Sequence, residues 1–249
     1  MTIHFIGAGP GAADLLTVRA VALLSAAPVC VYAGTYVDAE ILAHCPPGVR
    51  LIDSRRLNLD QITEHLVEAD RAGLDVARLC SGDPSLYSAL AEQTRRLDRA
   101  GVGWDVTPGV PAYAAAAALL GRELTVPEVT QTVILTRAQA DSTAMPEAES
   151  LTRLAESQAT LVLHLAIRHI RRLSAELTAA YGADCPVAVV SRATQPSELI
   201  LRGTLADIAP QVKEHGLVRT AVIVVGRTLG AEQFRDSHLY SPDRDRHIC

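Results

Sequence analysis

Lysine is nearly missing from this chain. Lys213 is the only lysine among 23 basic residues, and the acidic residues number 28, which gives a formal net charge of −5. Proteins that bind nucleic acid carry a basic surface, so this charge balance argues against a nucleic-acid partner. Genomic base composition explains the arginine bias most simply, although arginine also suits bidentate recognition of carboxylates.

Cysteine patterns and long apolar runs are also lacking. The cysteines number five, which is odd, and none has C-x-x-C spacing, so neither a disulfide framework nor a zinc site is predicted. The start has no basic segment followed by an apolar one, and no apolar run is long enough to cross a bilayer. We therefore predict a reduced, cytoplasmic protein with no membrane partner.

Apolar residues make up 49% of the chain and aromatic residues only 4%, which is typical of buried parallel strands under Ala-rich helices. Short apolar strands alternate with helices through the first half, so we predict a mainly parallel sheet with right-handed crossovers. The alternation restarts after 121–127, a predicted hinge between α/β domains at 1–122 and 128–249. Segments 192–196 and 199–203 suggest a hairpin, and hence a mixed second sheet.

Three elements have boundaries that the spacing of apolar residues predicts directly. They are a helix over 14–26, a second helix over 85–99 and a strand over 129–135.

The loop Cys80–Tyr87 follows a buried apolar strand and leads into the helix predicted over 85–99. Gly82 can take a positive φ, and Pro84 suits a first helical turn. Asp83 places a carboxylate at the carboxyl end of a strand, where open α/β sheets bind ligands. A tight turn capped by this Asp, without any ligand, is the structural alternative.

The loop Gly7–Ala12 fits the dinucleotide pattern G-x-G-x-x-A. Two features weaken the match. The second strand ends in Tyr32–Gly34 with no acid for a ribose until Asp38, and Pro10 removes a backbone donor that a pyrophosphate would use. A ligand with little or no phosphate suits this loop, and a tight turn for close packing fits it equally well.

Four loops follow strands, at 7–12, 33–38, 81–87 and 107–113, and should gather at the carboxyl edge of the first sheet. They predict a mostly neutral cleft facing the second domain, with Asp83 as its acid. Such a cleft suits a cofactor with a positive or neutral head and a ribose.

Metal binding and nucleophilic catalysis by serine have weak support in the sequence. His164 and His169 lack an accompanying carboxylate pair, so no metal site is predicted. Ser81 and Ser85 lie outside any G-x-S-x-G pattern, and we name no general base.

In this order and spacing, the motifs resemble those of the tetrapyrrole methylases over about residues 2–242. The resemblance implies two α/β domains, with S-adenosylmethionine (SAM) bound in the cleft between them. It also implies a homodimer. The motifs that carry it are Gly7–Gly11 with Leu15–Thr17, Gly82–Pro84, Thr107–Val110 and Thr220–Gly226.

Within the family, segments 31–37, 82–87 and 125–137 are most similar to the enzymes that methylate carbon 11 of precorrin-4 in corrin (cobalamin) synthesis, giving precorrin-5. Uroporphyrinogen methylases have an acid where this chain has Ala33, which argues against uroporphyrinogen as substrate. The cobalt form of precorrin-4 and another methylation position on a precorrin remain alternatives, as do an NAD-dependent dehydrogenase and a tetrapyrrole carrier without enzymatic activity.

The family pattern also implies site residues. Pro111 and Ala112 replace a pair that is usually small and hydroxylated in relatives, and Leu165 replaces a frequent Met, leaving only apolar contact with adenine. Tyr36, Tyr87 and Tyr113, on the cleft loops, are candidate contacts to the substrate ring. The implied cofactor-binding residues are Pro10, Ser81, Gly82, Asp83, Leu86, Pro111, Ala112, Leu165, Ala193, Thr220 and Ala221.

Overall fold

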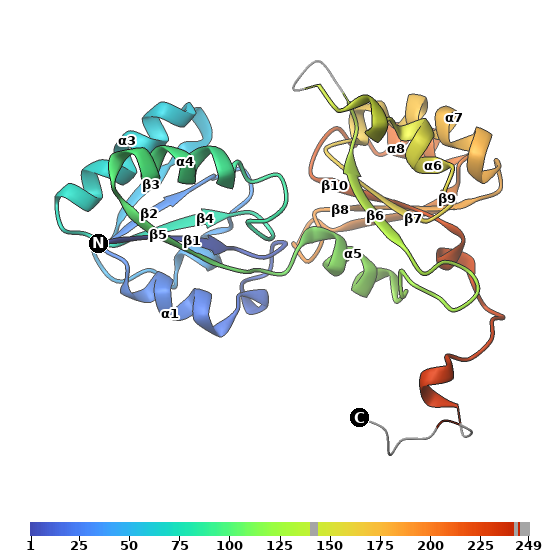
Figure 1. Ribbon diagram of the computed structural model, residues 1–249, viewed down its shortest axis with the longest axis horizontal. Helices are drawn as coiled ribbons and strands as arrows, with labels where there is room; N and C mark the ends of the chain where they lie inside the picture. The colour runs from blue at the N-terminus through green and yellow to red at the C-terminus, as the bar shows by residue number, and fades with distance from the viewer. Residues whose placement is uncertain (140–143, 242–243, 245–249) are drawn as a thin grey trace. The chain divides into compact units, whose positions relative to one another are not determined.

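A computed structural model describes residues 1–139, 144–241 and 244. The chain divides into two compact units (Figure 1). The first comprises Met1–Ala115 with Thr194–Pro196, and the second comprises Ala116–Ala193 with Ser197–Cys249. The division falls inside helix α5 (Ala112–Leu120), and the domain boundary at 121–127 stays a prediction.

The first unit holds a five-stranded sheet in the order β3-β2-β4-β1-β5. Every pairing in it is parallel, as predicted. The strands are β1 (Thr2–Gly7), β2 (Val29–Tyr32), β3 (Arg50–Asp53), β4 (Val76–Cys80) and β5 (Gly103–Thr107). The helices are η1 (Ala13–Leu15), α1 (Val18–Ala26), α2 (Ala39–Leu42), η2 (Ser54–Arg56), α3 (Leu59–Arg71) and α4 (Leu90–Ala100).

Helices cover both faces of this sheet (Figure 1). On one face, Phe5 of β1 packs in a cluster with Leu66 of α3 and Leu97 of α4. On the other, Ile6 packs in a cluster with Leu24 of α1. Successive strand residues point to opposite faces, so the near-continuous apolar runs of the sequence reflect burial on both sides.

The second unit also holds a five-stranded sheet, in the order β6-β7-β10-β8-β9. The β6–β7 pair is parallel and the other pairs are antiparallel, which confirms the predicted mixed sheet. The predicted hairpin is wrong in its first strand, because β9 pairs with β8 and segment 192–196 forms the turn between them. The strands are β6 (Val133–Arg137), β7 (Thr160–His164), β8 (Pro186–Ser191), β9 (Leu199–Thr204) and β10 (Ala221–Val225). The helices are η3 (Glu147–Glu149), α6 (Leu151–Ala155), η4 (Ile167–His169), α7 (Ile170–Tyr181), α8 (Ile208–Glu214), η5 (Arg227–Gly230) and η6 (His238–Tyr240).

The helix predicted over 85–99 is wrong at its start, because α4 begins only at Leu90. Tyr87 and Ala89 both have φ of 55°, in the left-handed region, which is incompatible with a continuing right-handed helix. Pro84 therefore lies in an irregular loop and not in a first helical turn.

The helix predicted over 14–26 is interrupted. Thr17 is extended, and its side-chain oxygen accepts a hydrogen bond from the Ala20 amide, so α1 begins at Val18. A Ser or Thr in this position is a common helix start, and the sequence did contain that signal.

The strand predicted over 129–135 begins four residues later, at Val133. The preceding residues form a tight turn in which the Thr130 amide donates to the Val126 carbonyl at 3.0 Å, with Glu128 at a φ of 61°.

Three free cysteines are buried, one in each hydrophobic cluster of the chain. Cys30 and Cys80 lie in the clusters on opposite faces of the first sheet, and Cys185 lies in the cluster of the second unit. Burial raises the thiol pKa of all three above the ordinary value.

Candidate functional site

The loops after β1 and β4 are joined by backbone hydrogen bonds. The Ala8 amide donates to the Cys80 carbonyl at 2.8 Å, and Gly9 and Gly82 exchange a pair of bonds at 3.2 and 2.8 Å. This pairing extends the sheet past its last strand residues and fixes the loop that carries Asp83.

Glycine is required where the ends of β1, β4 and β5 meet. A Cβ on Gly7 would lie 2.4 Å from the Gly109 nitrogen, and a Cβ on Gly109 would lie 2.3 Å from the Gly82 carbonyl oxygen. Neither Gly7 nor Gly109 was among the predicted site residues. Gly7 is the last residue of the apolar strand β1, and a glycine at that position is the signal that could have indicated this close backbone contact.

Asp83 fastens the β4 loop to the β5 loop. Its Oδ1 accepts from the amide and the hydroxyl of Ser85, and its Oδ2 accepts from the Gly109 amide at 2.9 Å. Burial opposes ionisation, but these hydrogen bonds outweigh it and hold the pKa of Asp83 below its ordinary value. A carboxylate has about four acceptor positions, so one remains for a ligand.

The structure brings the predicted cofactor residues of the first unit to one edge of the sheet. Gly82 has a φ of +65°, and a Cβ there would meet nothing closer than 3.6 Å, so backbone conformation is what favours glycine. Among these residues Ser81 is exposed, and the half-buried ones are Pro10, Asp83, Leu86, Pro111 and Ala112. This group comprises Pro10, Ser81, Gly82, Asp83, Leu86, Pro111 and Ala112, in the loops after β1, β4 and β5 and at the start of α5.

Two of the predicted substrate-contacting tyrosines are exposed in the loops after β2 and β4. Tyr36 follows β2 and is 42% exposed, and Tyr87 follows β4 and is 46% exposed. Tyr113 lies in the first turn of α5 and is half-buried. Exposed aromatic side chains beside a candidate site are suited to contacting an apolar ring.

The loop after β2 is held by Asp53 at the end of β3. Asp53 accepts from the Gly34 amide at 3.1 Å and from Arg55 Nε at 2.6 Å. Hydrogen bonds from Arg55 and Gly34 lower the pKa of Asp53. The carboxylate next to the end of β2 is therefore paired with an arginine.

The first unit lacks the features of a dinucleotide site. In the dinucleotide-binding fold the strand order is 3-2-1-4-5-6, whereas β4 here lies between β2 and β1. The amides of Ala8, Gly9 and Ala12 already have acceptors within the protein. In addition, η1 separates the glycine loop from α1, so no long helix begins where a pyrophosphate would lie.

A buried arginine is linked through a glutamine to the end of the loop after β4. Arg78 of β4 is 7% exposed and donates from Nε to Gln93 Oε1 at 3.0 Å. Gln93 in turn donates to the carbonyls of Ser88 and Ala89, just before α4. Sequence reasoning missed this network, because Arg78 lies inside a run that was interpreted as an apolar strand.

The predicted cofactor residues of the second unit also share one sheet edge. Because β10 is antiparallel to both β7 and β8, its first residue, Ala221, pairs with Ser191 at the end of β8. The Arg192 amide donates to the Thr220 carbonyl at 2.9 Å. The ends of β7 and β8 and the start of β10 therefore bring together Leu165, Ala193, Thr220 and Ala221.

This edge carries strained backbone. Leu165, Arg192 and Thr220 have φ values of 53°, 50° and 55°, a conformation that is uncommon outside glycine and rare for a β-branched residue such as Thr. Leu165 is also 67% exposed. Clustered left-handed residues that are kept at a sheet edge point to a functional role.

The described residues show neither a metal-binding cluster nor a membrane-spanning helix. Across 1–139, 144–241 and 244, no three His, Cys, Asp or Glu side chains come together in a way that could hold a metal ion. Burial lowers the pKa of His164. No helix within these ranges is long and apolar enough to cross a membrane.

Comparison with known proteins agrees with this geometry. Residues 2–209 match the family described as Tetrapyrrole (Corrin/Porphyrin) Methylases. A precorrin-4 C(11)-methyltransferase from Rhodococcus erythropolis is 60% identical over 246 residues, which cover 99% of each chain.

Solved structures extend the likeness to the fold. The X-ray structure of a cobalt precorrin-4 methyltransferase, a cobalamin biosynthetic enzyme, superimposes with a TM-score of 0.89 at 38% identity, covering 92% of this chain and 95% of that one. A uroporphyrin-III C-methyltransferase from Thermus thermophilus, solved in complex with S-adenosylhomocysteine, gives a TM-score of 0.77 at 27% identity, covering 92% and 93%. Fold, loop architecture and sequence agree, and this chain belongs to the tetrapyrrole methylase family.

Proposed function

We propose that this chain transfers the methyl group of SAM to carbon 11 of precorrin-4, giving precorrin-5 in corrin synthesis. The observation that carries the proposal is the 60% identity, over 99% of both chains, with a relative named for that reaction. The hydrogen-bonded loops at the edge of the first sheet supply a suitable cofactor site.

The chemistry of these loops suits SAM. Their glycine-rich backbone offers few free amides, because Ala8, Gly9 and Gly82 donate to other backbone groups, and SAM has no phosphate that would need them. The remaining acceptor position on Asp83 suits a ribose hydroxyl or the ammonium group of the amino-acid part. Leu165, Ala193, Thr220 and Ala221 stay predicted contacts to the adenine.

The role of the protein in the reaction is mainly to position the reactants. SAM supplies a methyl group that its sulfonium charge has already activated. Orientation of two reactants can contribute about 7–11 kcal/mol to lowering a barrier, and rigid loops such as those fastened by Asp83 provide it. The electron-rich macrocycle spreads the charge that develops, so we assign no general base. Tyr36, Tyr87 and Tyr113 are proposed to contact the ring.

The cobalt form of precorrin-4 is the second candidate substrate. The solved structure with a TM-score of 0.89 is named a cobalt precorrin-4 methyltransferase. A protein with a closely similar fold is therefore named for the cobalt-containing substrate. Methylation at another ring position is the remaining alternative within the family.

Product analysis tests the reaction. The purified protein is incubated with SAM carrying a ¹³C-labelled methyl group and with either precorrin-4 or cobalt-precorrin-4, and NMR locates the new methyl group. We expect label at carbon 11 of precorrin-4. Label at any other carbon, or no transfer to either substrate, contradicts the proposal.

Calorimetry with S-adenosylhomocysteine tests the cofactor site. We expect Asp83→Ala to weaken binding while the variant remains folded, and Glu40→Ala, which removes an exposed carboxylate after β2, to leave binding unchanged. Equal affinities in the two variants would contradict a cofactor role for Asp83. Mass spectrometry of copurified small molecules separates the rival classes: S-adenosylhomocysteine for a methylase, NAD for a dehydrogenase, tetrapyrrole alone for a carrier.

A homodimer and a cytoplasmic location are part of the same proposal. The homodimer is implied by the family resemblance, and the location is predicted from the cysteine pattern and the start of the sequence. Light scattering tests the first, since a dimer has twice the chain mass of 26.5 kDa. Fractionation of cells that express the tagged protein tests the second.

A further inference from the structure

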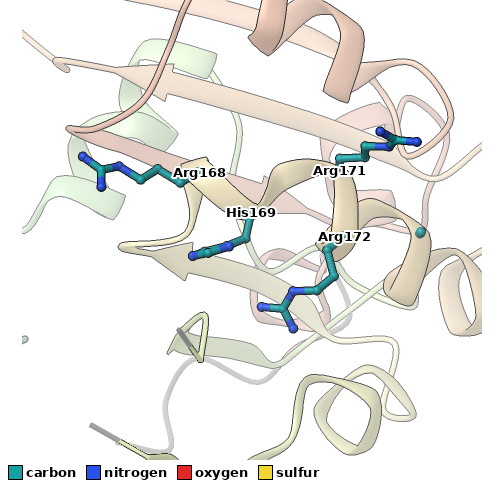
Figure 2. A pocket seen from close by; sticks show the side chains of 5 residues that line it. Arg168, His169, Arg171 and Arg172 are labelled. Atoms are coloured by element: carbon teal, nitrogen blue, oxygen red, sulfur yellow. The ribbon is translucent and has the colours of Figure 1, made fainter. Parts of the chain in front are cut away.

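A cluster of basic side chains lies where β7 passes into α7 in the second unit. Arg168, His169, Arg171 and Arg172 line a surface depression of about 440 Å³. The arginines are exposed and His169 is half-buried. Figure 2 shows Arg168, His169 and Arg172 pointing to one side of the η4–α7 junction, whereas Arg171 points to the other.

Two of these arginines are oriented by backbone carbonyls from neighbouring loops. Arg168 donates from Nε to the Val218 carbonyl at 3.0 Å, and Arg172 donates from Nη2 to the Gln139 carbonyl at 2.9 Å. A guanidinium has five N–H donors, so each side chain keeps donors for a ligand. Because one donor is already fixed, less side-chain entropy is lost when the others bind.

The charge of the cluster is only partly neutralised. Glu176 lies 3.8 Å from Arg172 Nη1 and also accepts from the Thr152 hydroxyl. Within the part of the chain that the structure describes, no carboxylate comes within 4 Å of Arg168 or Arg171. The depression therefore presents net positive charge on an otherwise acidic chain.

Exposed apolar side chains border these cations. Val218, whose carbonyl accepts a hydrogen bond from Arg168, is 54% exposed. Leu165, which directly follows β7 and precedes Arg168 by three residues, is 67% exposed. Cations beside apolar surface match a ligand that combines an apolar framework with acidic groups on its rim. Tetrapyrrole precursors of the corrin ring have that chemistry, since acetate and propionate side chains surround the macrocycle.

We infer that Arg168 and Arg172, with His169 between them, bind side-chain carboxylates of the tetrapyrrole substrate. The inference rests on the proposed function and names residues that recognise the substrate. These are binding and positioning residues, so their loss should raise KM for the tetrapyrrole while leaving SAM binding intact.

Substitution tests the inference in the full-length enzyme. Arg168→Gln and Arg172→Gln remove the charges while retaining a donor for the carbonyls of Val218 and Gln139. A charge-assisted hydrogen bond contributes enough that we expect KM for precorrin-4 to rise about tenfold in each variant and further in the double variant. The S-adenosylhomocysteine Kd should not change. Arg202→Gln is the matched control and should retain the KM of the wild type. It changes an exposed arginine on β9, which β10 and β8 separate from β7 in the sheet.

Each possible result decides one question. If the wild type does not methylate precorrin-4, the proposed function fails. If it does and the double variant keeps the wild-type KM, the carboxylate inference fails. Sulfate that competes with precorrin-4 in the wild type and not in the double variant supports the site. A double variant whose KM rises only together with a change in oligomeric state would overturn the inference in favour of a contact between copies of the chain.

Discussion

The Oδ2 atom of Asp83 accepts a hydrogen bond from the backbone amide of Gly109 at 2.9 Å, across 26 positions of sequence. This bond joins the loops after β4 and β5, which flank the loop after β1. A carboxylate expected either to bind a cofactor or to cap a helix thus fastens the loops of the candidate site together.

The first prediction concerns pH. Because the pKa of Asp83 lies below the ordinary 3.8 in the folded protein, its ionised form contributes stability above that value. The contribution is lost as the pH falls through the folded-state pKa. In an NMR titration, we expect the Gly109 amide resonance to follow the carboxylate, with a midpoint below 3.8.

Asp83→Asn is the control for this titration. The variant should lose the transition at Gly109, and its stability should approach that of the wild type as the pH falls. A Gly109 midpoint at or above the ordinary carboxyl pKa would contradict the assignment.

The second prediction concerns the contact between backbones. Gly109→Ala would place a methyl group 2.3 Å from the Gly82 carbonyl and 2.8 Å from Gly7, so backbone must shift. We expect a loss of about 3 kcal/mol in the free energy of unfolding, measured by urea denaturation. Gly103→Ala at the start of β5, where the nearest atom is 3.5 Å away, should change it by less than about 1 kcal/mol. Similar losses in both variants would refute the steric argument.

The third prediction separates backbone strain from ligand contact. Gly82 has a φ of +65° and Gly101 a φ of +70°, and at neither position would an added Cβ meet another atom within 3.4 Å. Alanine at either position should cost about 1–2 kcal/mol of stability. Only Gly82→Ala should weaken S-adenosylhomocysteine binding in calorimetry, by at least about tenfold. If both variants bind equally well, the ligand does not approach the backbone at Gly82.

The fourth prediction concerns the buried pair Arg78 and Gln93. Gln93→Leu leaves the Arg78 Nε without its acceptor and frees two carbonyls before α4. We expect a loss of about 3 kcal/mol in the free energy of unfolding. Adding Arg78→Met should restore part of it, because an apolar pair leaves no guanidinium unpaired. Additive losses in the double variant would show that the two side chains act independently.

The sheets could be predicted from sequence because apolar runs bounded by Gly and Pro mark strands that are buried on both faces. The common position of the loops after β1, β4 and β5 followed, since parallel strands end at a common edge. The helix start at Leu90 could not, because Tyr87 and Ala89 adopt left-handed backbone that neither residue type favours. The carbonyls of Ser88 and Ala89 in this segment accept hydrogen bonds from the Gln93 side chain, which the spacing of apolar residues does not reveal.

The role of Asp83 was open for a similar reason. Its position in the loop was evident from Gly82 and Pro84, but its partner, the Gly109 amide, comes from another strand. The arginine cluster was recognisable only as a pair of adjacent charges at 171–172. Its orientation depends on the carbonyls of Val218 and Gln139, which the fold brings to it.

The alkylation rates of the three buried cysteines can report local unfolding of the chain. Cys30, Cys80 and Cys185 each lie in a different hydrophobic cluster, and a thiol with a raised pKa reacts slowly until water reaches it. Alkylation followed by mass spectrometry would therefore time the opening of each face of the first sheet, and of the second unit, in one unmodified sample. A ligand that stabilises the first unit should slow the alkylation of Cys30 and Cys80. No introduced probe is needed for this measurement.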